Sequence, residues 1–282
     1  MAFKQSAFTD DEYPTARWNL KWDACHPHSC RDLMHPLRGL AAHAYALGEI
    51  LRCVASSRDL DGWLEVGELL RVVGGLARVN VTTAKYSDDP AYCETVMDWE
   101  NARSRVVSAY ATDLTRLLFA YNAFETALAN VVSRRALKRK PQWELSRSVL
   151  QEHIGEIMPV ITHYECSVES LLCVGRSWDK TAFDEIADHP GIADSLRAMD
   201  LVQVVRNRCV HEGIRFPSEP AAAKLSERGV LRRSTRLSIM TIQLFAMIAF
   251  KELLGDGIDD EIAELSTMHL MPDDASCGDE FE

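Results

Sequence analysis

An apolar seam about seven helical turns long most constrains what this chain can fold into. Its members recur three and four positions apart, the spacing at which side chains line one face of an α-helix. They are Val107, Tyr110, Leu114, Leu117, Tyr121, Phe124, Leu128 and Val131. A long helix with one apolar face must bury that face against other helices, so the seam predicts a helical bundle.

Further helical periodicities on both sides of the seam predict an all-α bundle. We expect helices at 37–54, 63–77, 144–175 with a kink at Pro159, 191–213 and 231–254. No strand-period run and no internal repeat is apparent. We therefore predict an additional N-terminal helical lobe at 1–90, the bundle at 91–255 and an acidic, mobile tail at 256–282.

The cysteines and the apolar runs indicate a cytoplasmic protein. The eight cysteines are scattered, several within apolar helix faces, as is typical of reduced thiols in the cytosol. The longest apolar run, 237–250, is interrupted by polar residues and is shorter than the roughly 18 residues that span a bilayer. Nothing at the amino end resembles a secretory signal, so we expect no membrane association.

A stretch near the amino end has the residue types of a zinc site. Cys25, His26, His28, Cys30 and His35 fall close together, and thiolates and imidazoles suit zinc. The four-residue gap between Cys25 and Cys30 is unusual, however, and no second ligand pair follows. We therefore predict no metal and no cofactor, with zinc at Cys25, His28, Cys30 and His35 as the open alternative.

The net charge of −11 argues against a nucleic-acid partner, but its distribution weakens that argument. The last 27 residues are rich in Asp and Glu and lack Lys and Arg, which leaves the rest of the chain close to neutral. Arginine forks bind phosphate oxygens in pairs. Two cation groups are candidates, although ordinary solvated helix ends would look the same. The first, which we predict to bind RNA, is Arg134, Arg135, Lys138, Arg139 and Lys140, and the second is Arg232, Arg233 and Arg236.

The most informative polar segment is 204–213, which reads Val-Val-Arg-Asn-Arg-Cys-Val-His-Glu-Gly. Arg206 is followed directly by Asn207, and His211 comes five residues after the arginine. Gly213 then gives the helix a typical C-terminal stop. Because an apolar-periodic run precedes Arg206, the segment predicts polar side chains at the end of a helix that packs in the bundle.

An arginine with a histidine five residues later proves little by itself. For the Arg and His content of this chain, about 0.7 such pairs are expected by chance, and about 0.1 when Asn, Asp or His must follow the arginine. A second pair, Arg38 and His43, lacks that polar residue because Gly39 follows the arginine. It lies in an Ala-rich helix, so we interpret the second pair as structural.

The pattern of Arg206, Asn207 and His211 resembles the hallmark of the HEPN superfamily: Arg, a polar residue, three further residues and His, on a helix of a bundle. The resemblance covers residues 102–254 and implies that the predicted all-α bundle is HEPN-like, with the N-terminal helical lobe as an addition to it. The segment 121–125, which ends at Glu125, also looks like the first bundle helix of such proteins, where an acidic residue often faces the active site. Glu125 is thus a fourth candidate catalytic residue. We expect it to border the core, with an ordinary ion pair there as the alternative.

Physical reasoning gives the motif residues compatible roles. In an α-helix Asn207 and His211 share a face, whereas Arg206 lies about 140° around from His211 and has to reach across. Imidazole exchanges protons near neutral pH, and a guanidinium stabilises the charge that develops on an attacked phosphate. RNA supplies its own nucleophile, the 2′-hydroxyl, so such a site needs no metal.

The resemblance implies a metal-independent endoribonuclease, acting as a toxin or antiviral defence effector. It also implies a homodimer whose two motif helices face a shared cleft, and an antitoxin or other regulatory protein as a further partner. The first alternative is a non-catalytic, HEPN-like module that binds RNA or a nucleotide. The second is a helical scaffold in which the motif is accidental.

Overall fold

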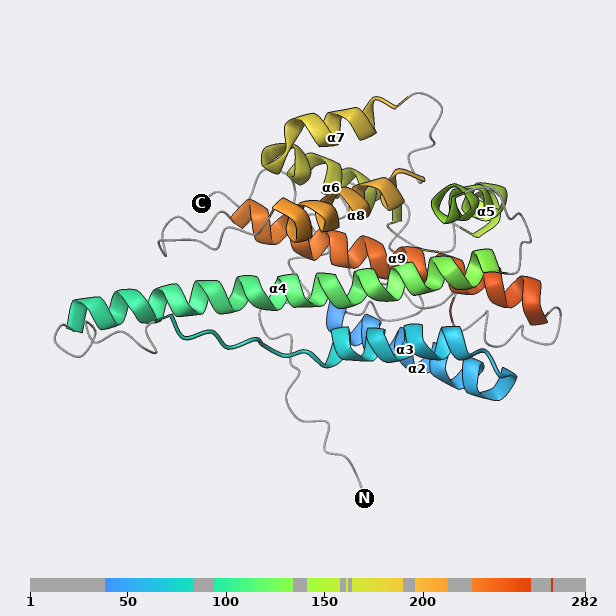
Figure 1. Cartoon of the computed structure of the whole chain (residues 1–282), viewed down its shortest axis with the longest axis horizontal. Helices are drawn as coiled ribbons and strands as arrows, with labels where there is room; N and C mark the ends of the chain where they lie inside the picture. Colours follow the sequence, from blue (N-terminus) through green and yellow to red (C-terminus); the bar gives the residue numbers. More distant parts are fainter. Residues whose placement is uncertain are drawn as a thin grey trace, which may run out of the picture.

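The computed structural model describes residues 39–83, 94–133, 141–157, 161, 164–189, 196–212, 225–254 and 265. This part of the chain is helical and contains no strand, which confirms the predicted all-α class. The helices, drawn in Figure 1, are α2 (Leu40–Arg58), α3 (Asp61–Gly75), α4 (Glu94–Ser133), α5 (Gln142–Ile157), α6 (Tyr164–Trp178), α7 (Lys180–Ala187), α8 (Arg197–Asn207) and α9 (Leu225–Leu254).

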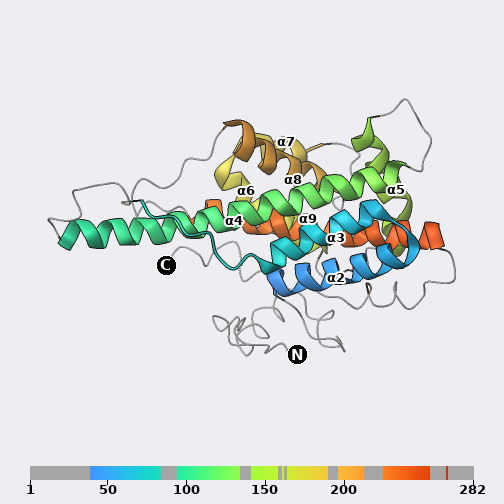
Figure 2. The same ribbon diagram turned by 60° about the horizontal axis from the view of Figure 1, so that its bottom comes forward.

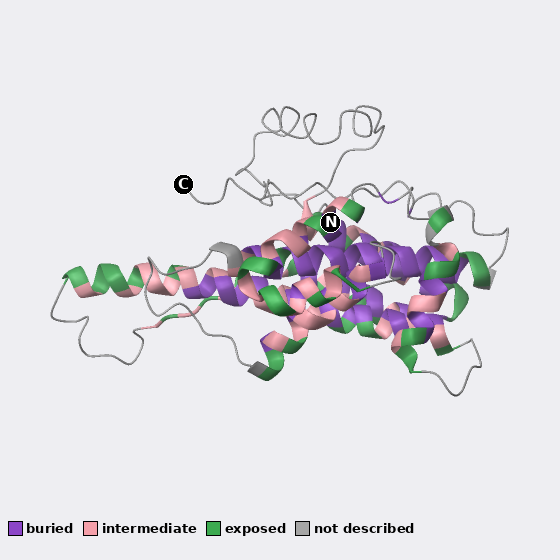
Figure 3. Ribbon diagram, turned by 90° about the horizontal axis from the view of Figure 1, so that it is seen from above, coloured by how far each residue is buried: buried purple, intermediate pink, exposed green. Residues whose placement is uncertain are grey.

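Two long helices, α4 and α9, form the centre of the molecule. They lie side by side, with α2 and α3 packed on one side of the pair and α6, α7 and α8 on the other (Figures 1 and 2). Every residue of α9 from 233 to 250 is buried, as Figure 3 shows by colour. This burial on all sides explains why residues 237–250 are mostly apolar around the whole circumference of the helix. None of the helices described is both long and apolar enough to cross a membrane.

The predicted seam is the buried face of α4. All its members are buried except Leu114, which is partly buried. Phe124 lies at its centre, with ring centroids of Trp143 on α5 and Phe245 on α9 at 6.0 and 6.4 Å. Helix α4 begins at Glu94, earlier than the seam, and its first turns extend beyond the other helices and are largely exposed (Figure 3).

Helices α2 and α3, the described part of the expected N-terminal lobe, share their core with α4 and α9. Trp63 of α3 meets Phe250 of α9 edge to face, with 5.4 Å between ring centroids. One continuous cluster of buried side chains includes residues from all four helices. The division of the chain near residue 90 stays a prediction, and the tail at 256–282 lies outside the described residues apart from Leu265.

A short internal repeat pairs α2 with α3, and the prediction that there is none is wrong. Gly-Glu-Ile-Leu-Arg at 48–52 recurs as Gly-Glu-Leu-Leu-Arg at 67–71. In the structure, the arginine of each copy forms an ion pair with the glutamate of the other. The Nε–Oε1 distances are both 2.5 Å, in the pairs Arg52–Glu68 and Arg71–Glu49. The repeat is only five residues long, so the helical periodicity around it concealed it.

The glycines of this repeat let the two helix backbones touch. A Cβ atom added to Gly67 would lie 2.8 Å from the carbonyl oxygen of Gly48. A Cβ added to Gly48 would lie 2.7 Å from the carbonyl oxygen of Gly67. Both separations are far inside van der Waals contact, and backbone atoms cannot turn aside as a flexible side chain can.

Gly67→Ala is expected to lower the free energy of unfolding by about 1–3 kcal/mol, because the added methyl group must push α2 and α3 apart. The matched control is Gly75→Ala in the last turn of α3, where an added Cβ meets nothing within 4 Å. The control should be neutral or slightly stabilising, since Ala favours helix over Gly by roughly 1 kcal/mol. Urea unfolding followed by circular dichroism measures both, and equal effects would contradict the close crossing.

The single kinked helix predicted at 144–175 is wrong, because the structure has two helices there. Helix α5 ends at Ile157 and α6 begins at Tyr164, and Figure 1 shows α5 nearly end-on while α6 lies across the view. Pro159 falls between them. Proline removes a backbone donor and disfavours helix in the residue before it, so it ends a helix as readily as it bends one.

Helix α7 was not predicted at all. Its eight residues are too few to show a helical period, but two local features define it. The Asp179 side chain accepts a hydrogen bond from the backbone N–H of Ala182 at 3.2 Å, which caps the first turn. Phe183 is fully buried against Gly175 of α6, where a Cβ atom would lie 1.9 Å from its ring.

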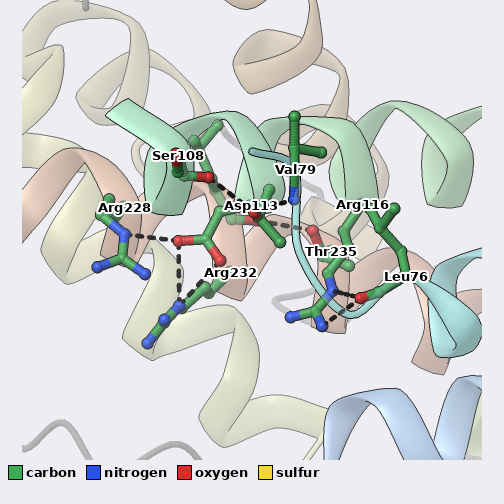
Figure 4. Close-up of polar contacts among 10 residues, drawn as sticks. Leu76, Val79, Ser108, Asp113, Arg116, Arg228, Arg232 and Thr235 are labelled. Carbon is green, nitrogen blue, oxygen red and sulfur yellow. Dashed lines mark hydrogen bonds and ion pairs between the residues drawn. The ribbon is translucent and has the colours of Figure 1, made fainter. Parts of the chain in front are cut away.

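The segment that follows α3 runs in extended form along α4. The backbone N–H group of every second residue donates to a hydroxyl on α4, and successive hydroxyls are four residues apart. This spacing matches because two extended residues and four helical residues both advance by roughly 6 Å. The pairs are Val79 to Thr112 (2.9 Å), Val81 to Ser108 (2.9 Å) and Thr83 to Ser104 (3.1 Å). Arg116 continues the row by donating to the carbonyl oxygen of Leu76, as Figure 4 shows.

The second predicted group of cations is structural. Asp113 of α4, only 2% exposed, accepts from Arg228 Nε at 2.7 Å and from Arg232 Nε at 3.2 Å, both on α9 (Figure 4). Arg233 and Arg236 are each 3% exposed, and they donate to serine hydroxyls of α6 at 2.7 and 3.2 Å. These arginines hold α4, α6 and α9 together, so neither a solvated helix end nor a phosphate-binding patch describes them.

The prediction of reduced thiols holds at some positions and is wrong at one. Cys53, Cys166 and Cys209 carry free thiols. Cys173, on α6, is disulfide-bonded. A disulfide is unusual in the reducing cytosol, so the predicted cytoplasmic location receives no support from the cysteines.

Candidate functional site

The predicted motif lies where α8 changes its helical form. Leu201, Val202 and Val205 bury one face of α8, which leaves Arg206 half-buried and Asn207 exposed at its end. A π-helical segment, Arg208–Glu212, follows directly and contains His211, which is also exposed. Gly213, the predicted helix stop, lies outside the described residues. The motif is therefore presented at the surface on a buried, rigid support.

The structure brings the three motif residues together. Arg206 Nη1 donates to Asn207 Oδ1 at 3.1 Å and lies 3.4 Å from Nε2 of His211. An α-helix would separate Arg206 from His211 by about 140°, as we expected. A π-helix instead closes i→i+5 hydrogen bonds, so residues five apart come close to the same side. The expected long reach of Arg206 around the helix is thus wrong, and the π-helical turn supplies the approach.

The Arg206–His211 contact indicates which ring nitrogen of His211 accepts a hydrogen bond. A guanidinium carries five N–H donors and no acceptor. His211 Nε2 is therefore the acceptor in this contact, which requires a neutral imidazole with its proton on Nδ1. When a ligand oxygen takes over the Arg206 donor, Nε2 of this exposed histidine is free to accept a proton, which is the chemistry of a general base.

The guanidinium group of Arg206 lies over a buried aromatic ring. The guanidinium carbon lies 5.2 Å from the ring centroid of Tyr121, a residue of α4 that is 3% exposed. Glu125 lies one helical turn further on, close enough for its carboxylate to act on the Tyr121 hydroxyl. Burial, together with the negative charge of Glu125, raises the pKa of Tyr121 to about 12, although Arg206 opposes the shift. From the sequence, Tyr121 had no predicted functional role. Its helical spacing predicted that the ring is buried, but not that Arg206 lies over it.

Glu125 is exposed, so the expectation that it borders the core is wrong. The pattern placed it on the row beside the seam, but at this level of α4 that row faces outward. Its connection to the motif runs through Tyr121: the Glu125 charge raises the pKa of the Tyr121 hydroxyl, and the Tyr121 ring contacts Arg206. The structure thus brings Glu125 near the motif residues by way of a side chain that the motif does not contain.

The residue between the polar motif positions anchors the π-helical turn. The Arg208 guanidinium carbon lies 4.7 Å from the ring centroid of Trp178, at the end of α6, and Arg208 forms an ion pair with Asp179. Asp179 is also the residue that caps α7. The next residue, Cys209, is buried, and burial raises the pKa of its thiol to about 12, so that it stays protonated and unreactive.

Three other sequence predictions concern the first cation group, the Cys/His stretch and the second Arg–His pair. The first cation group, residues 134–140, follows the end of α4 at Ser133 but lies outside the described residues, as does the Cys/His stretch at 25–35. His43 is fully buried and its Nε2 lies 3.0 Å from Gln243 Oε1, which agrees with a structural role for the second Arg–His pair. Across the described ranges, no three His, Cys, Asp or Glu side chains are grouped to hold a metal.

Comparisons with family models, with curated proteins and with solved structures found no match to this chain.

Proposed function

We propose that the chain is a metal-independent endoribonuclease of HEPN type, in which Arg206, Asn207 and His211 cut RNA. The observation that carries the proposal is the 3.4 Å approach of Arg206 Nη1 to His211 Nε2 on an exposed π-helical turn. A side chain of the type that exchanges protons thus lies beside a cation of the type that binds phosphate, and His211 is exposed to solvent. Both the residue types and their exposure suit catalysis better than packing.

The residues divide the reaction between them as follows. Neutral His211 accepts the proton of the 2′-hydroxyl, and the freed oxygen attacks the adjacent phosphorus. Arg206 donates to the phosphate oxygens as negative charge builds up on them. The bond from phosphorus to the 5′-oxygen then breaks, and a protonated histidine returns a proton to that oxygen. The products are a 2′,3′-cyclic phosphate and a 5′-hydroxyl.

The proposal includes partners. Two copies of the chain would face their motif turns across a shared cleft, so that one His211 takes up the proton while the other supplies one. The cations at 134–140 would follow the RNA backbone away from the site. A toxin or defence role in the cytoplasm, restrained by an antitoxin or another regulatory protein, completes the proposal.

Incubation of the purified protein with total RNA, with and without EDTA, tests this proposal. Cleavage should proceed equally in both samples, because no step uses a metal. If the protein shifts RNA in a gel but leaves it intact, the non-catalytic binding module is the correct function. If it neither binds nor cuts RNA, the motif is accidental and the chain is a helical scaffold.

A further inference from the structure

We infer that Tyr121 is a positioning residue that holds Arg206 ready for phosphate, and that Glu125 influences the site only through Tyr121. This inference rests on the proposed function and names a residue outside the motif on which that function depends. It reassigns Glu125 from a catalytic residue to a support for the Tyr121 ring.

The two arginines beside Asn207 are held in contrasting ways. Both guanidinium groups lie over aromatic rings, Arg206 over Tyr121 of α4 and Arg208 over Trp178 of α6. Arg208 also forms an ion pair with Asp179, so its charge is largely cancelled. Within the part of the chain that the structure describes, Arg206 has no ion pair, and its polar contacts are Asn207 Oδ1 and His211 Nε2.

An aromatic ring can fix an arginine without neutralising it. A carboxylate would hold the guanidinium more strongly, but it would also occupy the N–H donors and oppose the binding of an anion. The ring face attracts the cation weakly, by about 0.5–2 kcal/mol, and leaves the edge of the guanidinium free. Tyr121 therefore provides the orientation that a phosphate-binding arginine needs while its charge stays available.

Two neighbours act on the Tyr121 ring. Its body packs beside Phe124, with 5.9 Å between ring centroids, and the residue is buried on α4. Its hydroxyl lies close enough to Glu125 for that carboxylate to raise the pKa of Tyr121. Because the carboxylate acts on the hydroxyl, at the edge of the ring, Glu125 is coupled to Tyr121 and forms no ion pair with Arg206 in the described part of the chain. A flexible arginine side chain otherwise has about 2 kcal/mol of rotamer freedom to lose before it can act.

The test compares substitutions that keep or remove the ring face. Tyr121→Phe keeps the face and should lower kcat by no more than about threefold, and Glu125→Gln, which keeps an acceptor for the hydroxyl, should do the same. Tyr121→Leu removes the face, and misplacement of a catalytic group by about 1 Å costs up to about 100-fold, so kcat should fall by about 10- to 100-fold. KM should change little, since Arg206 acts mainly on the charge of the transition state.

Matched controls are available on α6. Tyr164 is buried to a similar degree and its hydroxyl lies 3.1 Å from Thr241 Oγ1, but it contacts no motif residue. Tyr164→Phe and Tyr164→Leu should leave kcat within about twofold when assayed below their unfolding temperatures. If Tyr121→Leu does not fold, Tyr121→Met replaces it, because a flexible apolar side chain fills the space without offering a ring face.

A second readout does not depend on activity. In ¹⁵N-labelled protein, the Nε2 signal of His211 reports whether Arg206 donates to it. That signal should shift in Tyr121→Leu and stay in place in Tyr121→Phe. Unchanged kcat and an unchanged His211 signal in folded Tyr121→Leu, or equal losses in the Phe and Leu variants, would overturn the positioning role. If the wild-type chain cuts no RNA, the proposed function fails, and the His211 signal alone decides the role of Tyr121.

Discussion

His211→Ala should lower RNA cleavage by about 10²- to 10⁴-fold, which is the contribution expected of a general acid or base. Arg206→Ala should lower it by about 10²- to 10³-fold, because one donor to the developing charge is lost. His211 is exposed and Arg206 only half-buried, so each variant should unfold within about 1–2 kcal/mol of the wild type. Single-turnover cleavage of a defined RNA, together with urea unfolding, measures both effects.

Two surface residues of the same types serve as controls. His153 on α5 lies 3.1 Å from Glu252, and Arg176 on α6 pairs with Asp184 at 2.8 Å, so neither control pairs with a motif residue in these contacts. Their alanine variants should cleave RNA at nearly the wild-type rate. The catalytic assignment would have no support if the controls lost activity to the same extent as the motif variants, or if the motif variants unfolded.

A substrate with deoxyribose at the cut position should be inert at that position. The proposed reaction has no other nucleophile than the 2′-hydroxyl, so its removal abolishes the reaction instead of slowing it. Binding should change by no more than a few-fold, because the phosphates that Arg206 contacts remain in place. Gel analysis of paired oligonucleotides, ribose and deoxyribose at one position, gives both results. Cleavage of the deoxyribose substrate would show that water is the nucleophile.

The central helices could be predicted because each satisfies one simple rule. Residues 107–131 repeat at helical spacing over many turns, and the buried face of α4 follows that spacing. The predicted helix at 231–254 lies within α9, whose residues 233–250 are all buried. A helical spacing of apolar residues that continues over many turns is recognisable even when single positions depart from it. The all-α class could therefore be predicted from the sequence.

Features that depend on one or two residues were missed. Helix α7 rests on the cap at Asp179 and the buried ring of Phe183, and neither creates a period. The break between α5 and α6 was predicted as a kink, because the sequence does not tell whether a proline bends a helix or ends it. The pairing of Gly48 with Gly67 depends on which helices cross, which periodicity does not specify.

The residues of the candidate site could be named, but their geometry could not. Arg206 and His211 were identified by type and spacing, yet their contact depends on a π-helical turn that has no recognised sequence signal. Tyr121 lies 85 positions before Arg206, and only the packing of α8 against α4 joins them. The cations of α9 show the same limit, since the carboxylate of Asp113 that pairs with two of them is on another helix.

The chemistry of the fragment ends tests the central claim most directly. RNA of known sequence is cleaved in the presence of EDTA, and the fragments are weighed by mass spectrometry. Attack by the 2′-hydroxyl predicts a 2′,3′-cyclic phosphate on one fragment and a 5′-hydroxyl on the other. Ends with a 5′-phosphate and a 3′-hydroxyl, or cleavage that stops in EDTA, would mean that a metal-activated water cuts the chain, and would contradict the assignment of Arg206 and His211.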